Sequence, residues 1–171
     1  MPKDLIIGID PGISGGFGVL SVSDPDWIEL CTMPATVVQN GKRQQHEYDL
    51  AVAWTYLATW KAQGVRAVWI ERGGTRPGQH AMAVYKTGYG VGLWHGMLVG
   101  MNLPIRWVYP VVWKRAQGLL KQDKRASRLM VQERWPKVGA LKASQEGAAE
   151  ALLIADYGRK EDWDHDGKRV S

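Results

Sequence analysis

Short apolar runs separated by polar turns dominate the first part of the chain. Residues 5–9 are continuously apolar and end at Asp10, which predicts a strand buried on both faces. Two more apolar runs, 17–22 and 27–33, follow after turns too short to hold a parallel crossover, so we predict a three-stranded antiparallel meander. Residues 34–46 are polar and are predicted to form a loop.

The rest of the chain alternates helical and strand patterns. Residues 48–63 repeat apolar positions at helical spacing before Gly64, and residues 65–70 predict a fourth strand that ends at Glu71. The remaining predicted elements are, in order, a helix over 79–101, a strand over 105–109, a helix over 110–117, a helix capped by Asp123 that runs to 135, and a last helix from 144 or 145 to 158. This order predicts an α/β fold with a mixed five-stranded sheet flanked by helices.

The length of 171 residues corresponds to one domain, which we assign to residues 1–158, followed by a charged C-terminal tail over 159–171 that we expect to be disordered. Hydrophobic residues make up 45% of the chain, which excludes a disordered protein, and no apolar run reaches the ~20 residues of a membrane span. The single cysteine, Cys31, excludes an internal disulfide. Because no leader pattern precedes the first strand, we expect a cytoplasmic protein without a membrane partner.

Four acidic residues occupy positions that indicate a shared site. Asp10 and Glu71 end two strands that we expect to lie side by side and parallel. Glu150 lies in an otherwise apolar helical segment, and Glu146 precedes it by one turn on the same face. Carboxylates without cysteine or histidine favour Mg²⁺ or Mn²⁺, and two such ions support phosphodiester hydrolysis. Taken singly, each acid also has a structural explanation, so only their joint occurrence predicts a metal site.

Basic residues are unevenly distributed along the chain. The net charge is +5, yet residues 1–105 carry no net charge, residues 106–142 carry +8 and residues 143–171 carry −3. A basic block of this density suits a polyanion such as nucleic acid. The simpler alternative is a solvated basic face.

Three stretches of the chain carry a family resemblance: residues Ile7 to Gly12 with Gly15-Gly16, Trp69-Ile70-Glu71, and Glu150 to Ala155. Together they resemble the RuvC-type Holliday junction resolvases of the RNase H-like superfamily, with the phage and chloroplast branches most similar. The resemblance covers about residues 5–158. It implies a homodimeric endonuclease, in the cytoplasm of a bacterial cell or phage-infected host, that binds a four-way DNA junction and cuts two strands symmetrically with two Mg²⁺ or Mn²⁺ ions per active site.

The resemblance also implies roles for individual residues. Asp10, Glu71 and Glu150 match three acids of the family's tetrad, whereas Glu146 stands four residues before Glu150 and the bacterial pattern has its acid at Gly147. Lys124 matches a lysine near the scissile phosphate and is assigned a catalytic role with the acids. The residues expected to contact DNA are Lys114, Lys121, Lys124, Arg125, Arg72, Arg76, Tyr85 and Tyr89.

Glycines recur every fourth residue in the predicted helix over 79–101, at Gly88, Gly92, Gly96 and Gly100. A glycine in a helix interior costs about 1 kcal/mol relative to alanine, which indicates a packing reason. Either the same helix of a second subunit packs here, with Trp94 and Met97 supplying apolar contacts, or the helix lies close on its own sheet.

Other protein classes fit the sequence less well. An actin-like kinase needs two such domains and more than twice this length, and a dinucleotide-binding motif starting at Gly88 fails at Leu93, where it requires glycine. Two alternatives stay open: a junction-binding protein with an impaired metal site, and an RNase H-like nuclease acting on RNA or on other branched DNA.

Overall fold

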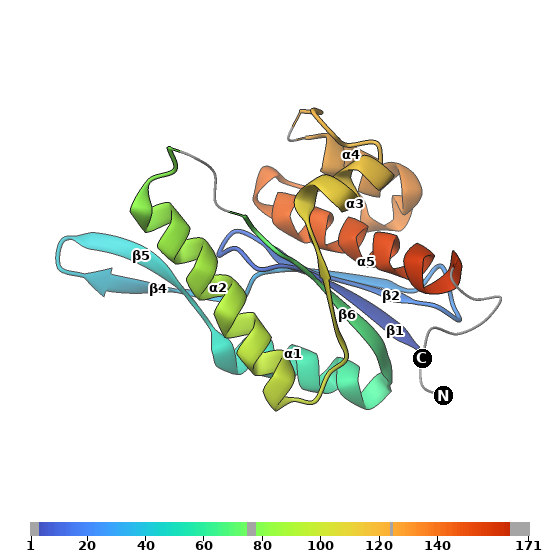
Figure 1. Ribbon diagram of the computed structural model, residues 1–171, viewed down its shortest axis with the longest axis horizontal. Helices are drawn as coiled ribbons and strands as arrows, with labels where there is room; N and C mark the ends of the chain where they lie inside the picture. Colours follow the sequence, from blue (N-terminus) through green and yellow to red (C-terminus); the bar gives the residue numbers. More distant parts are fainter. Residues whose placement is uncertain (1–3, 75–77, 124, 165–171) are drawn as a thin grey trace.

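A computed structural model describes residues 4–74, 78–123 and 125–164 (Figure 1). Its main sheet has five strands in the order β3-β2-β1-β6-β7. The antiparallel meander is formed by β1 (Leu5–Asp10), β2 (Gly16–Ser21) and β3 (Ile28–Thr32). Strands β6 (Val65–Glu71) and β7 (Ile105–Val108) continue the sheet in parallel with β1. The predicted mixed five-stranded sheet is confirmed.

Helices cover both faces of this sheet. One apolar core lies under α1 (Leu50–Gln63) and α2 (Ala81–Gly100). The other lies under α5 (Glu146–Asp164), against which α3 (Pro110–Ala116) and α4 (Ala126–Arg134) pack. Two short 3-10 turns, η1 (Pro136–Val138) and η2 (Ala143–Gln145), connect α4 with α5. In the described part of the chain, no helix has the length and apolarity needed to cross a bilayer.

Alternation along the strands decides which layer each acid faces. Odd-numbered apolar residues of β1 pack under α1 and α2, whereas Ile6 packs on the α5 side. Asp10 has the same parity as Ile6 and therefore lies on the α5 face. In β6, Trp69 packs on the α5 side, so Glu71 lies on that face as well.

Glycines in the sheet allow α5 to approach it closely. A Cβ on Gly8 would overlap the carbonyl oxygen of Ala151, and a Cβ on Gly18 would overlap the backbone of Leu152. The helix backbone thus rests directly on β1 and β2, which no larger residue permits. This close packing brings Glu150 of α5 toward the end of β1.

Residues 34–46 do not form the predicted loop. Most of them belong to a hairpin of β4 (Ala35–Asn40) and β5 (Arg43–Tyr48), which pair only with each other. Both faces of this hairpin are open to solvent, so its sequence shows no alternation of apolar and polar residues. The usual strand signal is therefore missing.

The ends of the last two helices also differ from the prediction. Helix α5 continues to Asp164, because Gly158 does not end it: the absent side chain allows close packing on the ring of Trp69. Residues 159–164 of the predicted tail are therefore helical, and residues 165–171 lie outside the described part. Asp123 does not cap α4, because the cap position is Arg125. The Asp123 carboxylate instead accepts a 2.8 Å hydrogen bond from the backbone N–H of Arg125.

The glycine row of α2 does not pack on the sheet of its own subunit. Gly88, Gly92, Gly96 and Gly100 are exposed, and apart from the neighbouring backbone of α2 no described atom lies within 4 Å of the Cβ that each lacks. The alternative that they allow close packing on the sheet is therefore wrong. Trp94 is fully buried in the core, which makes it unavailable for contact with a second subunit. A dimer contact through the glycine row stays a prediction.

Candidate active site

The carboxyl ends of β1 and β6 hold two acids side by side. Ile9 pairs with Ile70 in parallel register, so Asp10 and Glu71 follow on adjacent strands. Burial raises the pKa of Asp10 to about 6, although a 3.2 Å hydrogen bond from the backbone N–H of Gly12 opposes the shift. Burial and the negative charge of Asp10 raise the pKa of Glu71 to about 7.

Glu150 approaches the same sheet edge from α5. Its Oε1 accepts hydrogen bonds from Lys114 Nζ at 2.8 Å and from the Ser127 hydroxyl at 3.3 Å. The charge of Glu150 raises the pKa of both Asp10 and Glu71, and the ammonium of Lys114 lowers both. The Lys114 ammonium thus acts on three carboxylates at once. Its charge does not offset burial, so the pKa values of Asp10 and Glu71 stay raised.

Trp113 fixes Glu71 and was missed by sequence reasoning. The indole N–H donates to Glu71 Oε2 at 2.7 Å, and the Trp113 side chain is fully buried. Lys114, the next residue, places its ammonium 5.0 Å from the centre of the same ring. Consecutive residues of α3 therefore reach two different acids. No pattern in the sequence marks a tryptophan as the partner of an acid 42 residues away.

Glu146 lines a cleft together with Asp10 and Glu150. The cleft has a volume of about 460 Å³. Its lining comes from the β1–β2 turn and from the start of α5: Asp10, Gly12, Ser14, Gly15, Ala143, Ser144, Glu146, Gly147 and Glu150. Glu146 Oε2 is 3.9 Å from Arg128 Nε, and Glu71 lies outside the lining. The structure therefore brings Asp10, Glu146 and Glu150 into one cleft, with Glu71 beside Asp10.

Packing explains why residue 147 carries no acid. A Cβ at Gly147 would overlap the carbonyl oxygen of Ser14 and the Cα of Gly15. The helix thus touches the β1–β2 turn at this position, and no side chain fits there. An acid in this part of α5 has to stand elsewhere, and Glu146 is the neighbouring one that faces the cleft.

The donor set fits a hard divalent cation, although the acids are not gathered around one point. Among the described residues, no three aspartate, glutamate, histidine or cysteine side chains are close enough to surround a metal ion. Glu71, Glu146 and Glu150 each turn toward a donor or cation of the protein. Oxygen-only donors and an excess of buried negative charge nevertheless favour Mg²⁺ or Mn²⁺.

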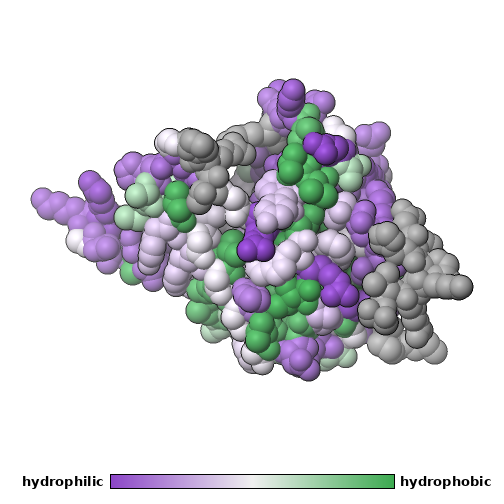
Figure 2. Space-filling view, in the orientation of Figure 1, coloured by the Kyte–Doolittle hydropathy of each residue, from purple (hydrophilic) through white to green (hydrophobic). Residues whose placement is uncertain are grey.

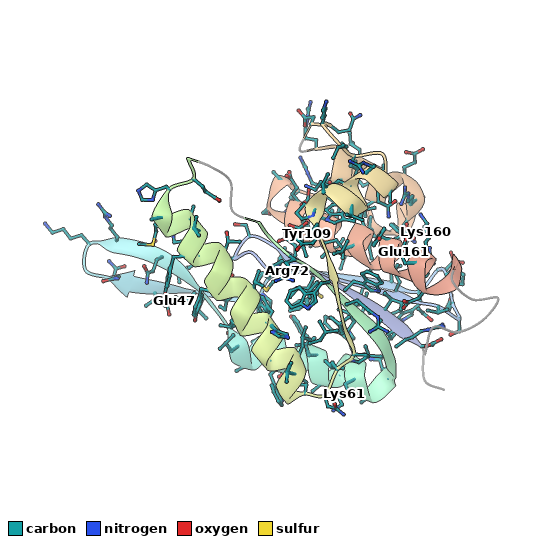
Figure 3. All side chains as sticks on the ribbon, viewed as in Figure 1. Glu47, Lys61, Arg72, Tyr109, Lys160 and Glu161 are labelled. Carbon is teal, nitrogen blue, oxygen red and sulfur yellow. The ribbon has the colours of Figure 1, made fainter. Side chains whose placement is uncertain are left out.

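The structure places several of the residues that we expect to bind DNA. Lys114 lies within it, and Lys121 and Arg125 are exposed in the connection between α3 and α4. Arg72 lies at the end of β6 with its guanidinium 5.6 Å from the centre of the Trp107 ring (Figure 3). Lys124 and Arg76 lie outside the described residues.

Tyr85 and Tyr89 form an exposed stacked pair on α2. Their ring centroids are 6.2 Å apart with an interplanar angle of 17°, and the residues are 65% and 52% exposed. Tyr89 also contacts Tyr48, whose hydroxyl donates to the carbonyl oxygen of Pro11 at 2.8 Å. Pro11 directly follows Asp10, which lines the cleft. The three tyrosines therefore form a row that starts beside the cleft with Tyr48 and continues through Tyr89 to Tyr85.

Comparison with known proteins finds a fold relationship without sequence similarity. No family model matches the chain, and no curated protein matches its sequence. The structure is similar to that of RuvC from Thermus thermophilus in complex with a Holliday junction substrate, with a TM-score of 0.58 and 19% identity over 92% of this chain and 94% of that one. A second structure of Thermus thermophilus RuvC gives a TM-score of 0.55, again with 19% identity, over 92% and 95%. The RNase H-like fold predicted from the sequence is therefore confirmed.

Proposed function

We propose that the protein is an endonuclease that resolves four-way DNA junctions by metal-dependent phosphodiester hydrolysis. The observation that carries the proposal is the pair of acids Asp10 and Glu71 at adjacent strand ends, with Glu150 opposite them. The raised pKa values of Asp10 and Glu71 mark negative charge that the protein does not fully compensate. The shared fold with a RuvC structure that holds a Holliday junction supports the substrate class.

The acids Asp10, Glu71, Glu146 and Glu150 would hold the divalent ions, two in each active site. When bound, Mg²⁺ or Mn²⁺ activates water and stabilises the leaving oxygen of the cleaved strand. Lys114 orients Glu150 through their 2.8 Å contact and supplies positive charge beside a bound phosphate. Lys124 is assigned the same charge-stabilising role at the scissile phosphate.

Further residues would bind and orient the junction. Lys121, Arg125, Arg72 and Arg76 would contact phosphates, and Tyr85 and Tyr89 would stack on unpaired bases. A junction has approximate two-fold symmetry, and each site cuts one strand, so symmetric cleavage requires a homodimer.

A cleavage assay tests this function. The protein is incubated with a synthetic four-way junction and with a matched linear duplex, with Mg²⁺ or with EDTA, and the nicks are mapped. We expect paired, symmetric cuts in the junction that require Mg²⁺, intact duplex, and loss of cutting but retained binding in Asp10→Asn. Cleavage in EDTA, or full activity of Asp10→Asn, would overturn the assignment.

A second candidate function is junction binding without cleavage. Position 147 has no room for an acidic side chain, and the neighbouring acid, Glu146, turns toward Arg128. This arrangement favours a site with impaired metal binding. Tight binding of the junction with no nicks at any Mg²⁺ or Mn²⁺ concentration would support it. Preferential cleavage of RNA or of another branched DNA would instead identify a different nuclease of the same fold.

A further inference from the structure

The hairpin β4–β5, called the ribbon below, packs against the core only through Tyr48 at its base. No residue of either strand is buried. The strands pair along their whole length, from Ala35 opposite Tyr48 to Asn40 opposite Arg43, and Figure 1 shows them projecting to the left of the sheet. An isolated two-stranded hairpin is only marginally stable in water. A ribbon that does not join the main sheet and has no fully buried residue therefore calls for a functional explanation.

The base of the ribbon is attached to the catalytic edge. Tyr48, its last residue, donates a 2.8 Å hydrogen bond to the carbonyl oxygen of Pro11, which follows Asp10. The Tyr48 ring packs edge-on against Trp94 at 5.5 Å, and Asp49 N–H donates to the Pro34 carbonyl at 2.9 Å. These contacts fix where the ribbon leaves the body. A nucleic acid strand in the cleft would therefore have its flanking duplex next to the ribbon.

The outer part of the ribbon is rich in hydrogen-bond donors and has no acid. Residues 39–46 carry a formal charge of +2, and Figure 2 shows this end of the molecule as hydrophilic. The charge comes from Lys42 and Arg43 at the tip, next to amide side chains at positions 39, 40, 44 and 45. The only acid of the ribbon, Glu47, lies near its base and accepts a 2.9 Å bond from Gln45.

This chemistry suits duplex DNA better than a protein surface. Stable protein interfaces have an apolar centre, and Val37, 57% exposed, is the only large exposed apolar side chain in the described residues of the ribbon. Lysine and arginine bind phosphates, and arginine, glutamine and asparagine bind the edges of guanine and adenine. A major groove about 12 Å wide also admits a two-stranded ribbon.

We infer that the ribbon is a DNA-binding arm that lies in the major groove of the duplex flanking the cleft. Lys42 and Arg43 contact phosphates, and the amide side chains read base edges, which gives the protein a sequence preference outside the cleavage site. The inference rests on the proposed function for the identity of the nucleic acid. A six-residue strand spans ~20 Å, so the arm covers about six base pairs beyond the cleft.

Removal of the two tip charges tests the arm. Binding of Lys42→Ala/Arg43→Ala to a four-way junction and to a linear duplex is measured in EDTA over a range of salt concentrations. We expect the slope of log K against log salt to decrease by about 0.9 for each phosphate that the variant no longer neutralises. Lys61→Ala/Arg66→Ala removes the same charge far from the cleft, at the end of α1 (Lys61, Figure 3) and the start of β6, and should leave the slope unchanged.

A shortened ribbon locates the contact along the DNA. Residues 38–45 are replaced by Asn-Gly, a sequence suited to a two-residue hairpin turn that joins Val37 to His46. Hydroxyl-radical footprinting of the bound junction should then show protection reduced by about three base pairs at the end of the footprint away from the cut site. The thermal unfolding midpoint should stay at the wild-type value, because the removed residues are outside the core.

The outcomes separate the arm from the proposed nuclease function. An unchanged salt slope and footprint in both ribbon variants overturn the arm, even when the wild type cuts junctions as proposed. A change in oligomeric state with unchanged DNA contact also overturns it and identifies a protein interface. Conversely, ribbon-dependent binding by a wild type that cuts no substrate supports the arm and rejects the nuclease.

Discussion

Trp113 donates its indole N–H to Oε2 of Glu71 at 2.7 Å from a fully buried position. The bond fixes one oxygen of an acid that stands at the end of a central strand, and it lowers the pKa of Glu71 against the larger effect of burial. Because Lys114 contacts Glu150, α3 positions an acid from the sheet and an acid from α5 at the same time. The relative position of Glu71 and Glu150 therefore depends on α3, although α3 itself contributes no acid to the site.

Trp113→Phe should slow cleavage without weakening junction binding. The substitution keeps an aromatic ring in the core but removes the donor to Glu71. A hydrogen bond to a charged acceptor contributes about 1.5–3 kcal/mol, so we expect a roughly ten- to hundredfold lower single-turnover rate. Trp135→Phe, at another buried tryptophan, is the control for packing loss. If both variants lose the same stability and neither loses rate, Trp113 has only a structural role.

The stability of the metal-free protein should decrease between about pH 4 and pH 7. Asp10 and Glu71 have folded-state pKa values of about 6 and about 7, above their ordinary values of 3.8 and 4.5. The folded state therefore binds protons more strongly, and the stability gained at low pH is lost as the pH rises through the folded-state pKa values.

The amide variants isolate this contribution. In Asp10→Asn, urea unfolding in EDTA should give a free energy that decreases less over the same pH range, by on the order of 2 kcal/mol. Mg²⁺ at pH 7.5 should stabilise the wild type more than the variant. Parallel pH profiles of the wild type and the variant would show that burial does not raise the pKa of Asp10.

Gly147→Asp should unfold the protein rather than add a further acid to the candidate site. The new Cβ overlaps the backbone of Ser14 and Gly15, which cannot move without displacing the turn after Asp10. We expect a loss of several kcal/mol in thermal or chemical unfolding, typical of overpacking against backbone. Gly96→Ala is the matched helical control: its Cβ meets open space, so it should be neutral or stabilise by up to about 1 kcal/mol. A stable, active Gly147→Asp would contradict the close contact between α5 and the turn.

Gly96→Leu should separate the proposed homodimer without unfolding the subunit. Gly96 is exposed, and apart from the neighbouring backbone of α2 no described atom lies within 4 Å of the missing Cβ. We therefore expect the leucine side chain to point away from the subunit and to interfere with a second chain. Sedimentation should then report a monomer, and the junction should receive single nicks. Gly96→Ala controls for the loss of glycine itself. A dimeric Gly96→Leu protein would place the interface on another surface.

Local patterns in the sequence were sufficient to predict much of the fold. Continuous apolar runs such as residues 5–9 identify central strands, and short turns require an antiparallel meander, because these features depend only on neighbouring residues. The helical crossover made β1 and β6 parallel, so the adjacency of Asp10 and Glu71 also followed from the sequence. The strands of the ribbon could not be predicted in this way, because strands exposed on both faces need no alternation of apolar and polar residues.

Tertiary structure alone decided how the acids are held. Trp113 meets Glu71, Lys114 meets Glu150, and Gly147 faces Ser14, and each pair joins residues far apart in the chain. Such contacts depend on how α3 and α5 pack on the sheet and on the turn after β1, and no local pattern encodes this packing. The sequence by itself therefore determined which acids face the same sheet edge, whereas packing of α3 and α5 determined the partner of each one.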